Sequence, residues 1–96
     1  MIDVRYFIDP ETDQPHIYGH GVSEDEVEDV LASPNEDRAG NKGSRIAIGQ
    51  TRAGRYLKVI YSTKDDATKG FFVITAYDLT GKQLAAFRRR RRGRWQ

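Results

Sequence analysis

The chain has 96 residues, of which 38% are hydrophobic and 31% are charged. This length suffices for one small domain but not for two. No apolar run approaches the ~20 residues of a membrane-spanning helix, and the first residues lack the basic start and apolar stretch of a secretory signal, so we expect a cytoplasmic protein without membrane contact. The sequence contains no cysteine, which excludes disulfide bonds and thiolate metal sites.

The amino-terminal part is predicted to hold one strand and one helix. Residues 2–8 alternate apolar and polar side chains and predict a strand, whereas residues 9–21 carry prolines and glycines and predict a loop with at most a short helical turn. Ser23 and Glu26 have the spacing of a capping box, in which each side chain accepts a hydrogen bond from the other residue's backbone amide. The helix that begins there is expected to end at residues 33–35, because proline cannot continue it.

The remaining part is predicted to be mainly strand. Residues 35–43 are polar and contain glycine, which predicts a loop, and residues 82–87 predict a short helix. Together the elements predict an α+β domain over residues 1–87, with an arginine-rich tail over residues 88–96. Its small antiparallel sheet of about four strands would carry helices mainly on one face. Three apolar runs separated by turn residues supply the later strands, at residues 45–51, 55–62 and 71–77.

Charge is unevenly distributed along the chain, although the formal net charge is only +2. Residues 1–37 hold eleven acidic side chains and one arginine, whereas residues 38–96 hold the other fifteen basic side chains and three aspartates. This division predicts one acidic and one basic surface, and the basic surface suits a polyanion. Internal neutralisation of the two surfaces is the alternative interpretation.

The carboxyl-terminal tail is the most unusual feature. Six of the seven residues 88–94 are arginine, and Trp95 follows them. Neutralised phosphates would release counterions, and the indole ring can stack on a base, so nucleic acid is one candidate partner. An acidic protein is another, and a second copy of the chain would give a homodimer through its acidic helix. A solvated tail that only improves solubility is the remaining alternative.

His16 and His20 are four residues apart, the spacing of two metal ligands or of an acid and a base on one helix face. Pro15, Gly19 and Gly21 disfavour a helix there. A histidine just before a helix more often satisfies local backbone groups. We therefore expect no metal site, and an orienting role for His20.

Strand alternation places cationic and phenolic side chains on one sheet face. Such a face can bind a phosphodiester, with a cation stabilising developing charge and a lysine or tyrosine moving protons. An ordinary solvent-exposed face is the alternative. The helix-facing residues would be Ile46, Ile48, Leu57, Val59, Phe72 and Ile74, and the opposite face would present Arg45, Tyr56, Lys58, Thr75 and Tyr77 beside Phe71 and Val73.

Short motifs follow one another in a characteristic order: YFIDP at residues 6–10, HGVSE at 20–24, IGQT at 48–51, GRYLKVIY at 54–61 and ITA at 74–76, before the arginine run. Their order and spacing resemble the BrnT group of bacterial toxins. These toxins are ribonucleases of the RelE/ParE-like superfamily, which belong to type II toxin–antitoxin pairs.

The resemblance implies a RelE-like fold and RNA cleavage without a metal or cofactor, by attack of a ribose 2′-hydroxyl on the adjacent phosphate. It implies that Arg55 and Arg45 hold the phosphate. Lys58 or Tyr61 would move protons, and Tyr77 would stack or donate. RNA or ribosome-associated mRNA would be the substrate, and a cognate antitoxin the protein partner. The candidate polyanion-binding residues are Arg45, Arg52, Arg88, Arg89, Arg90, Arg91, Arg92, Arg94 and Trp95.

Two departures from the family pattern support a second hypothesis. Residues 11–15 are acidic and broken by proline where the family usually has a basic helix. Tyr77 stands where the family often has an arginine, and residues 74–77 are similar to a related group of small domains of unknown function. The second hypothesis is a non-enzymatic binding module of the same fold, whose arginine-rich tail engages nucleic acid or an acidic protein.

Overall fold

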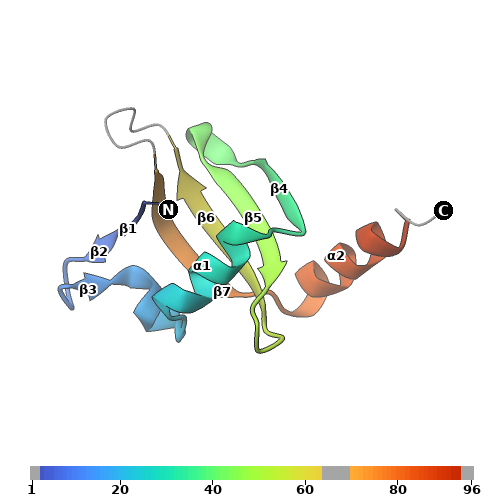
Figure 1. Cartoon of the computed structure of the whole chain (residues 1–96), viewed down its shortest axis with the longest axis horizontal. Helices are drawn as coiled ribbons and strands as arrows, with labels where there is room; N and C mark the ends of the chain where they lie inside the picture. The colour runs from blue at the N-terminus through green and yellow to red at the C-terminus, as the bar shows by residue number, and fades with distance from the viewer. Residues whose placement is uncertain (1–2, 64–69, 94–96) are drawn as a thin grey trace.

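The computed structural model describes residues 3–63 and 70–93, and it confirms the predicted α+β class. Figure 1 shows a twisted sheet crossed by one helix, with a second helix projecting from its end. Within the described residues, no helix is both long and apolar enough to cross a membrane. The elements in chain order are β1 (Val4–Tyr6), β2 (Ile8–Asp9), β3 (Gln14–Pro15), the 3-10 helix η1 (His16–His20), α1 (Glu24–Ala32), β4 (Glu36–Ala39), the 3-10 helix η2 (Asn41–Gly43), β5 (Arg45–Gln50), β6 (Tyr56–Ser62), β7 (Phe71–Asp78) and α2 (Gly81–Gly93).

Five strands form the main sheet in the order β1-β7-β6-β5-β4, and β2 pairs with β3 in a separate hairpin. β1 runs parallel to β7, whereas the other neighbouring pairs of the main sheet are antiparallel. β1 pairs only with the start of β7, from Phe71 to Val73. η1 contacts β7 as well, which brings His20 to the edge of the sheet.

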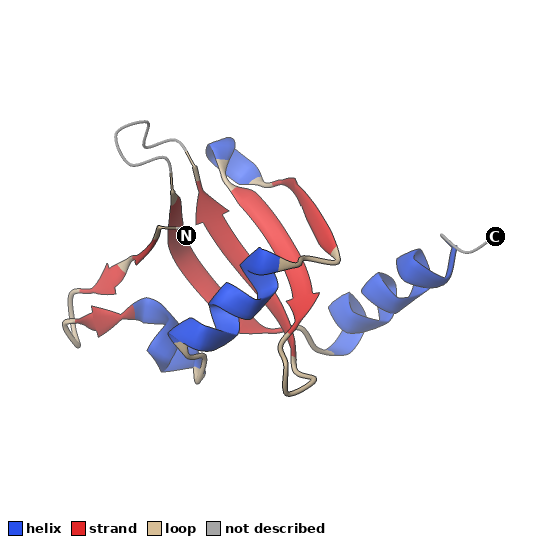
Figure 2. Ribbon diagram, in the orientation of Figure 1, coloured by secondary structure: helices blue, strands red, loops and turns tan. Residues whose placement is uncertain are grey.

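α1 begins where the capping box predicts. Ser23 Oγ accepts a hydrogen bond from Glu26 N at 3.2 Å, and the Glu26 carboxylate accepts one from Ser23 N at 3.0 Å. Val27, Val30 and Leu31 of α1 are buried against the sheet, and Figure 2 shows the helix lying across it. We call this side of the sheet the α1 face. Its strands contribute Ala47, Leu57, Val59, Tyr61, Val73 and Ala76 to the core.

α2 packs on the other side of the sheet, which we call the open face. Phe87 is 1% exposed and clusters with Ile48 and Leu79, and Leu84 packs at the margin of this cluster. Ile48 follows Ala47 in β5, and successive strand residues point to opposite faces, so the two cores lie on opposite sides. The structure therefore corrects the prediction that the helices lie mainly on one face. α2 also continues beyond residue 87 through the arginine run.

Two features of the sheet differ from the prediction. β4 adds a fifth strand, inside the segment predicted as a loop. It is a short edge strand with three charged residues, and charged edges lack the apolar alternation by which strands are found in a sequence. The sheet is mixed rather than antiparallel because β1 pairs with β7, a strand far along the chain.

The strand register also changes which side chains share a face. Ile48 pairs with Lys58, so both lie on the open face, whereas Arg45 pairs with Tyr61 on the α1 face. An irregularity between β6 and β7 brings Val73 opposite Tyr61, on the α1 face. The predicted faces were therefore wrong for Ile48, Arg45 and Val73, whereas the predicted face of Lys58 is confirmed. A register shift of one residue moves every side chain of a strand to the other face of the sheet. The register is fixed by pairing with strands that are distant in the sequence.

Candidate functional site

A basic groove runs between α2 and the open face of the sheet. Arg38 comes from β4 and Lys58 from β6, whereas Gln83 and Arg90 come from α2 and are two helical turns apart. The apolar side chains of Ile48, Leu79 and Ala86 complete its lining. The groove combines three cations with an apolar floor, and it is closed on one side by the helix that carries the arginine run.

Lys58 is the central cation of this groove. Its Nζ lies 3.5 Å from Gln83 Oε1 and 5.8 Å from the centre of the Tyr77 ring. Lys58 forms no ion pair with a carboxylate in the part of the chain that the structure describes. An ammonium group without a counter-ion can bind a phosphate, because no internal ion pair must first be broken.

The Tyr77 ring lies near both Lys58 and His20. The imidazole of His20 lies 5.9 Å from the Tyr77 ring, between centroids, and 5.2 Å from the imidazole of His16. The sequence predicted separate roles for Lys58, Tyr77 and His20, and the structure brings the Lys58 ammonium group and the His20 ring to the same tyrosine ring. We call these three residues the row. Such a row can supply a cation, a hydroxyl group and an imidazole that exchanges a proton.

Arg55 lies outside this row. Its guanidinium donates two hydrogen bonds to the Asp78 carboxylate, the longer being 3.0 Å, and further bonds of 3.0 Å to Glu26 and of 2.9 Å to Gly21 O. The hydrogen bonds to Asp78 contribute most to raising the pKa of Arg55, and they lower the pKa of Asp78. With two carboxylates as counter-ions, Arg55 has little capacity left for a phosphate.

The contacts of Arg55 give it a positioning role instead. Gly21 directly follows His20, and Asp78 directly follows Tyr77. One guanidinium therefore ties together the two backbone segments that present the imidazole and the phenol. The left-handed conformation of Gly21, with φ of 71°, ends η1 at this point.

Tyr61 lies on the α1 face, away from Lys58. It is 2% exposed, and its hydroxyl donates a short hydrogen bond to Asp37, which also pairs with Arg45 Nε at 2.8 Å. Burial, followed by the bond to Asp37, raises the pKa of Tyr61 to about 12. A phenol in this state stays protonated near neutral pH, and its proton is engaged by Asp37. The structure therefore does not bring Arg45, Arg55 and Tyr61 together with Lys58 and Tyr77.

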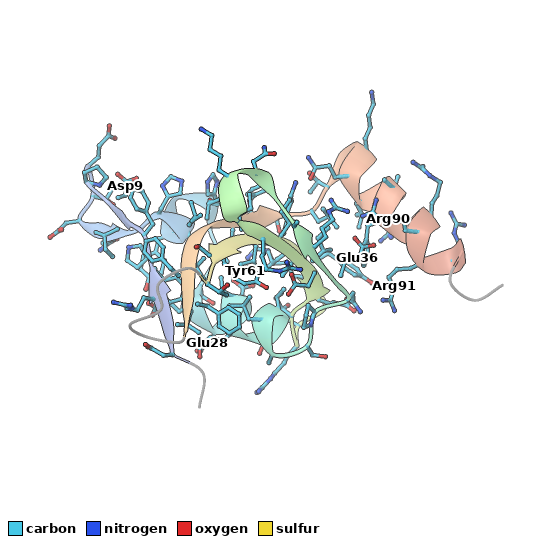
Figure 3. All side chains as sticks on the ribbon, turned by 90° about the horizontal axis from the view of Figure 1, so that it is seen from above. Asp9, Glu28, Glu36, Tyr61, Arg90 and Arg91 are labelled. Atoms are coloured by element: carbon cyan, nitrogen blue, oxygen red, sulfur yellow. The ribbon has the colours of Figure 1, made fainter. Side chains whose placement is uncertain are left out.

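The arginines of α2 differ in their partners. Arg90 donates to both oxygens of Glu36 in β4, at 2.8 and 2.9 Å, and Figure 3 shows the two side chains side by side. Among residues 3–63 and 70–93, no carboxylate pairs with the guanidinium groups of Arg88, Arg89, Arg91 and Arg92. Their mutual repulsion opposes the helix, but cations near a helix carboxyl end are favoured by its dipole. They place four positive charges on one helix.

Two residues of the groove were not predicted from the sequence, and several predicted binding residues lie away from the groove or outside the described residues. Arg38 was missed because its strand was predicted as a loop, and Gln83 because the side of α2 that faces the sheet depends on tertiary packing. Arg52 lies in the β5–β6 turn, with a side chain 93% exposed and 3.3 Å from Asp29. Arg94 and Trp95 lie outside the described residues.

Comparison with known proteins leaves the resemblance to the BrnT group as a prediction. No protein family, curated protein or solved structure matches the chain. No cluster of three histidine, aspartate or glutamate side chains suited to a metal ion occurs within the described ranges. The groove and α2 are therefore the features from which a function can be inferred.

Proposed function

We propose that the protein is a toxin-like protein that acts on RNA in the cytoplasm, as an endoribonuclease that needs no metal, and that a cognate antitoxin is its protein partner. The observation that carries the proposal is the row of Lys58, Tyr77 and His20 beside a helix whose outer arginines have no described counter-ion. The resemblance to the BrnT group supports the same function independently of this geometry.

The chemistry requires a base, a cation and an acid around one phosphate. In this proposal His20 accepts the proton of the ribose 2′-hydroxyl, and the 2′-oxygen attacks the adjacent phosphorus. Lys58 neutralises the negative charge that develops on the phosphoryl oxygens. The P–O5′ bond breaks, and Tyr77 donates a proton to the departing oxygen. The products are a 2′,3′-cyclic phosphate and a 5′-hydroxyl end. Transfer of the proton from the His20 imidazolium to the Tyr77 phenolate through solvent then restores both groups.

Incubation of the purified chain with single-stranded RNA and with programmed ribosomes tests the cleavage. We expect cyclic-phosphate ends from the wild type, and at least a hundredfold slower cleavage by Lys58→Ala and His20→Ala. Lys42→Ala removes the same type of side chain from the η2 turn and is the matched control. Equal cleavage by Lys58→Ala and Lys42→Ala would contradict the assigned site.

The arginines of α2 provide the second part of the proposal, which is RNA binding. A variant with Arg88, Arg89, Arg91 and Arg92 all changed to glutamine should bind RNA weakly and with a smaller salt dependence. The corresponding lysine variant keeps the charge and should retain most of the affinity. Fluorescence anisotropy of labelled RNA at several salt concentrations measures both quantities.

A non-enzymatic binding module is the second candidate function. Arg55 and Tyr61 were both expected to be catalytic. Arg55 is engaged in ion pairs and Tyr61 is buried, so neither is available to a substrate, and this favours the binding module. RNA binding by the wild type without cleavage, in both substrate mixtures, would support this candidate over the nuclease. Deletion of residues 88–96 should then abolish capture of RNA.

A further inference from the structure

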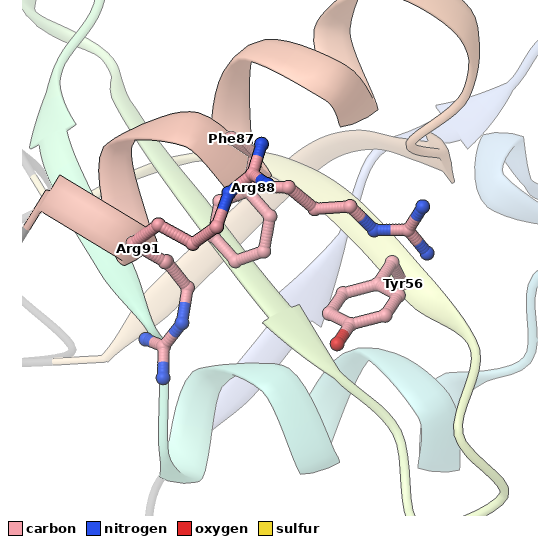
Figure 4. A pocket seen from close by; sticks show the side chains of 5 residues that line it. Tyr56, Phe87, Arg88 and Arg91 are labelled. Carbon is pink, nitrogen blue, oxygen red and sulfur yellow. The ribbon is translucent and has the colours of Figure 1, made fainter.

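A second pocket lies on the other flank of α2, away from the Lys58 groove. Tyr56 and Phe87 supply aromatic rings, and three arginines complete its lining (Figure 4). Its volume of about 490 Å³ lies in the range of small-ligand sites. Arg88, Arg91 and Arg92 have the spacing of neighbours on one helix face, whereas Gln83 and Arg90 project from a different one. The helix therefore separates two basic pockets.

Tyr56 gives this pocket a fixed aromatic surface. It begins β6, and its ring packs against the buried Phe87 with 5.6 Å between the centroids. Tyr56 itself is half-buried, so the ring is held on one side and accessible on another. A held ring loses little conformational freedom when a planar group stacks on it.

Arg88 lies over the same ring. Its guanidinium carbon is 6.0 Å from the centre of the Tyr56 ring, and Figure 4 shows its side chain extending toward the tyrosine. A planar base sandwiched between the two groups needs about 7 Å, which is twice the stacking distance. A movement of the flexible Arg88 side chain by about 1 Å would open that space.

The charge of the pocket selects an anionic ligand. None of its five lining residues is acidic, and Arg91 lies 5.8 Å from the centre of the Phe87 ring without a carboxylate partner in the described chain. Aromatic stacking combined with several guanidinium groups is the chemistry that recognises an unpaired base and its phosphates. A purely aliphatic anion would leave the ring unused.

We propose that this pocket binds one unpaired nucleotide, with the base between Tyr56 and Arg88 and the phosphates at Arg91 and Arg92. This inference extends the proposed function. It rests on that function in one respect, because it takes RNA as the source of the nucleotide. The pocket is then a subsite separated by α2 from the Lys58 groove, and it contributes affinity through stacking as well as charge. A free nucleoside monophosphate has the same chemistry and is the other source.

Anisotropy measurements with a short single-stranded RNA test the subsite on the full chain. Tyr56→Leu keeps an apolar contact with Phe87 but removes the aromatic surface, and it should weaken binding by about 10- to 100-fold. Tyr56→Phe should bind as the wild type does, as should Tyr18→Ala, which removes an exposed tyrosine of η1. Circular dichroism verifies that each variant is folded.

The outcomes separate the subsite from the proposed function. Full affinity in Tyr56→Leu, with loss of affinity in the arginine variant, would overturn the subsite and leave RNA binding intact. If the wild type binds no RNA, titration with adenosine monophosphate tests whether the pocket binds a free nucleotide. The titration is followed by NMR through the resonances of the Tyr56 ring. A shift with the nucleotide but not with inorganic phosphate supports the pocket as a site for free nucleotides, and no shift overturns it.

Discussion

Arg55 and Asp78 form a two-point ion pair that joins the residue before β6 to the last residue of β7. The same guanidinium reaches Glu26 in the first turn of α1. Three elements far apart in the sequence therefore meet at one arginine. Since the side chain of Arg55 is only 28% exposed, solvent screens these contacts less than it screens an ordinary surface pair.

Arg55→Ala should lower the free energy of unfolding by about 1–2 kcal/mol, because it removes several charge-assisted hydrogen bonds from a partly buried group. Arg52→Ala is the control, since its exposed side chain makes one ion pair and should contribute less than about 0.5 kcal/mol. Urea denaturation measures both values. If Arg55→Ala is as stable as the control variant but binds RNA much more weakly, Arg55 binds phosphate, as the resemblance implied.

Stability should fall in acid, and Arg55 should account for part of the fall. Hydrogen bonds from Arg55 lower the pKa of Asp78, and the Ser23 amide followed by Arg55 lowers the pKa of Glu26. Carboxylates with a lowered folded-state pKa stabilise the fold above their ordinary value of about 4, and the contribution disappears as the pH falls through the folded-state pKa. Urea denaturation between pH 7 and pH 3 should show a smaller decrease for Arg55→Ala than for the wild type. Parallel curves would refute the assignment.

Ser23→Ala should destabilise the protein by about 1 kcal/mol, because it removes the side chain that accepts the Glu26 amide at the start of α1. Ser33→Ala, at the other end of α1, is the matched control, since no cap of that type involves the Ser33 side chain. Thermal denaturation followed by circular dichroism measures the difference. An equal effect of the two substitutions would show that the capping box contributes nothing measurable.

Glu36→Gln should tighten RNA binding, because it removes a negative charge beneath α2 and releases Arg90 from its two-point ion pair. The salt dependence of binding should become steeper by up to about one unit, since one more arginine is available for phosphate. Glu28→Gln makes the same charge change on α1, across the sheet, and should have a smaller effect. Weaker binding by Glu36→Gln would indicate that the ion pair holds α2 in its binding orientation.

Local sequence patterns were sufficient where the stabilising contacts are local. The capping box at Ser23 and the proline after Ser33 determine the ends of α1 through contacts within a few residues. The turn between β5 and β6 was predicted for the same reason. β4 escaped prediction because its charged residues are held by pairing with β5 rather than by any apolar pattern of their own.

The sequence by itself determined the α+β class, the course of α1, the meander of later strands and the concentration of positive charge after residue 88, since each follows from periodicity, turn residues or composition. Only the tertiary structure decided which candidates meet. It placed both His20 and Lys58 near the Tyr77 ring, put Tyr61 on the face opposite Lys58, and paired Arg55 with Asp78. These relationships depend on strand register and on contacts between distant segments. A register shift of one residue moves every side chain of a strand to the other face of the sheet, so local sequence patterns do not determine them.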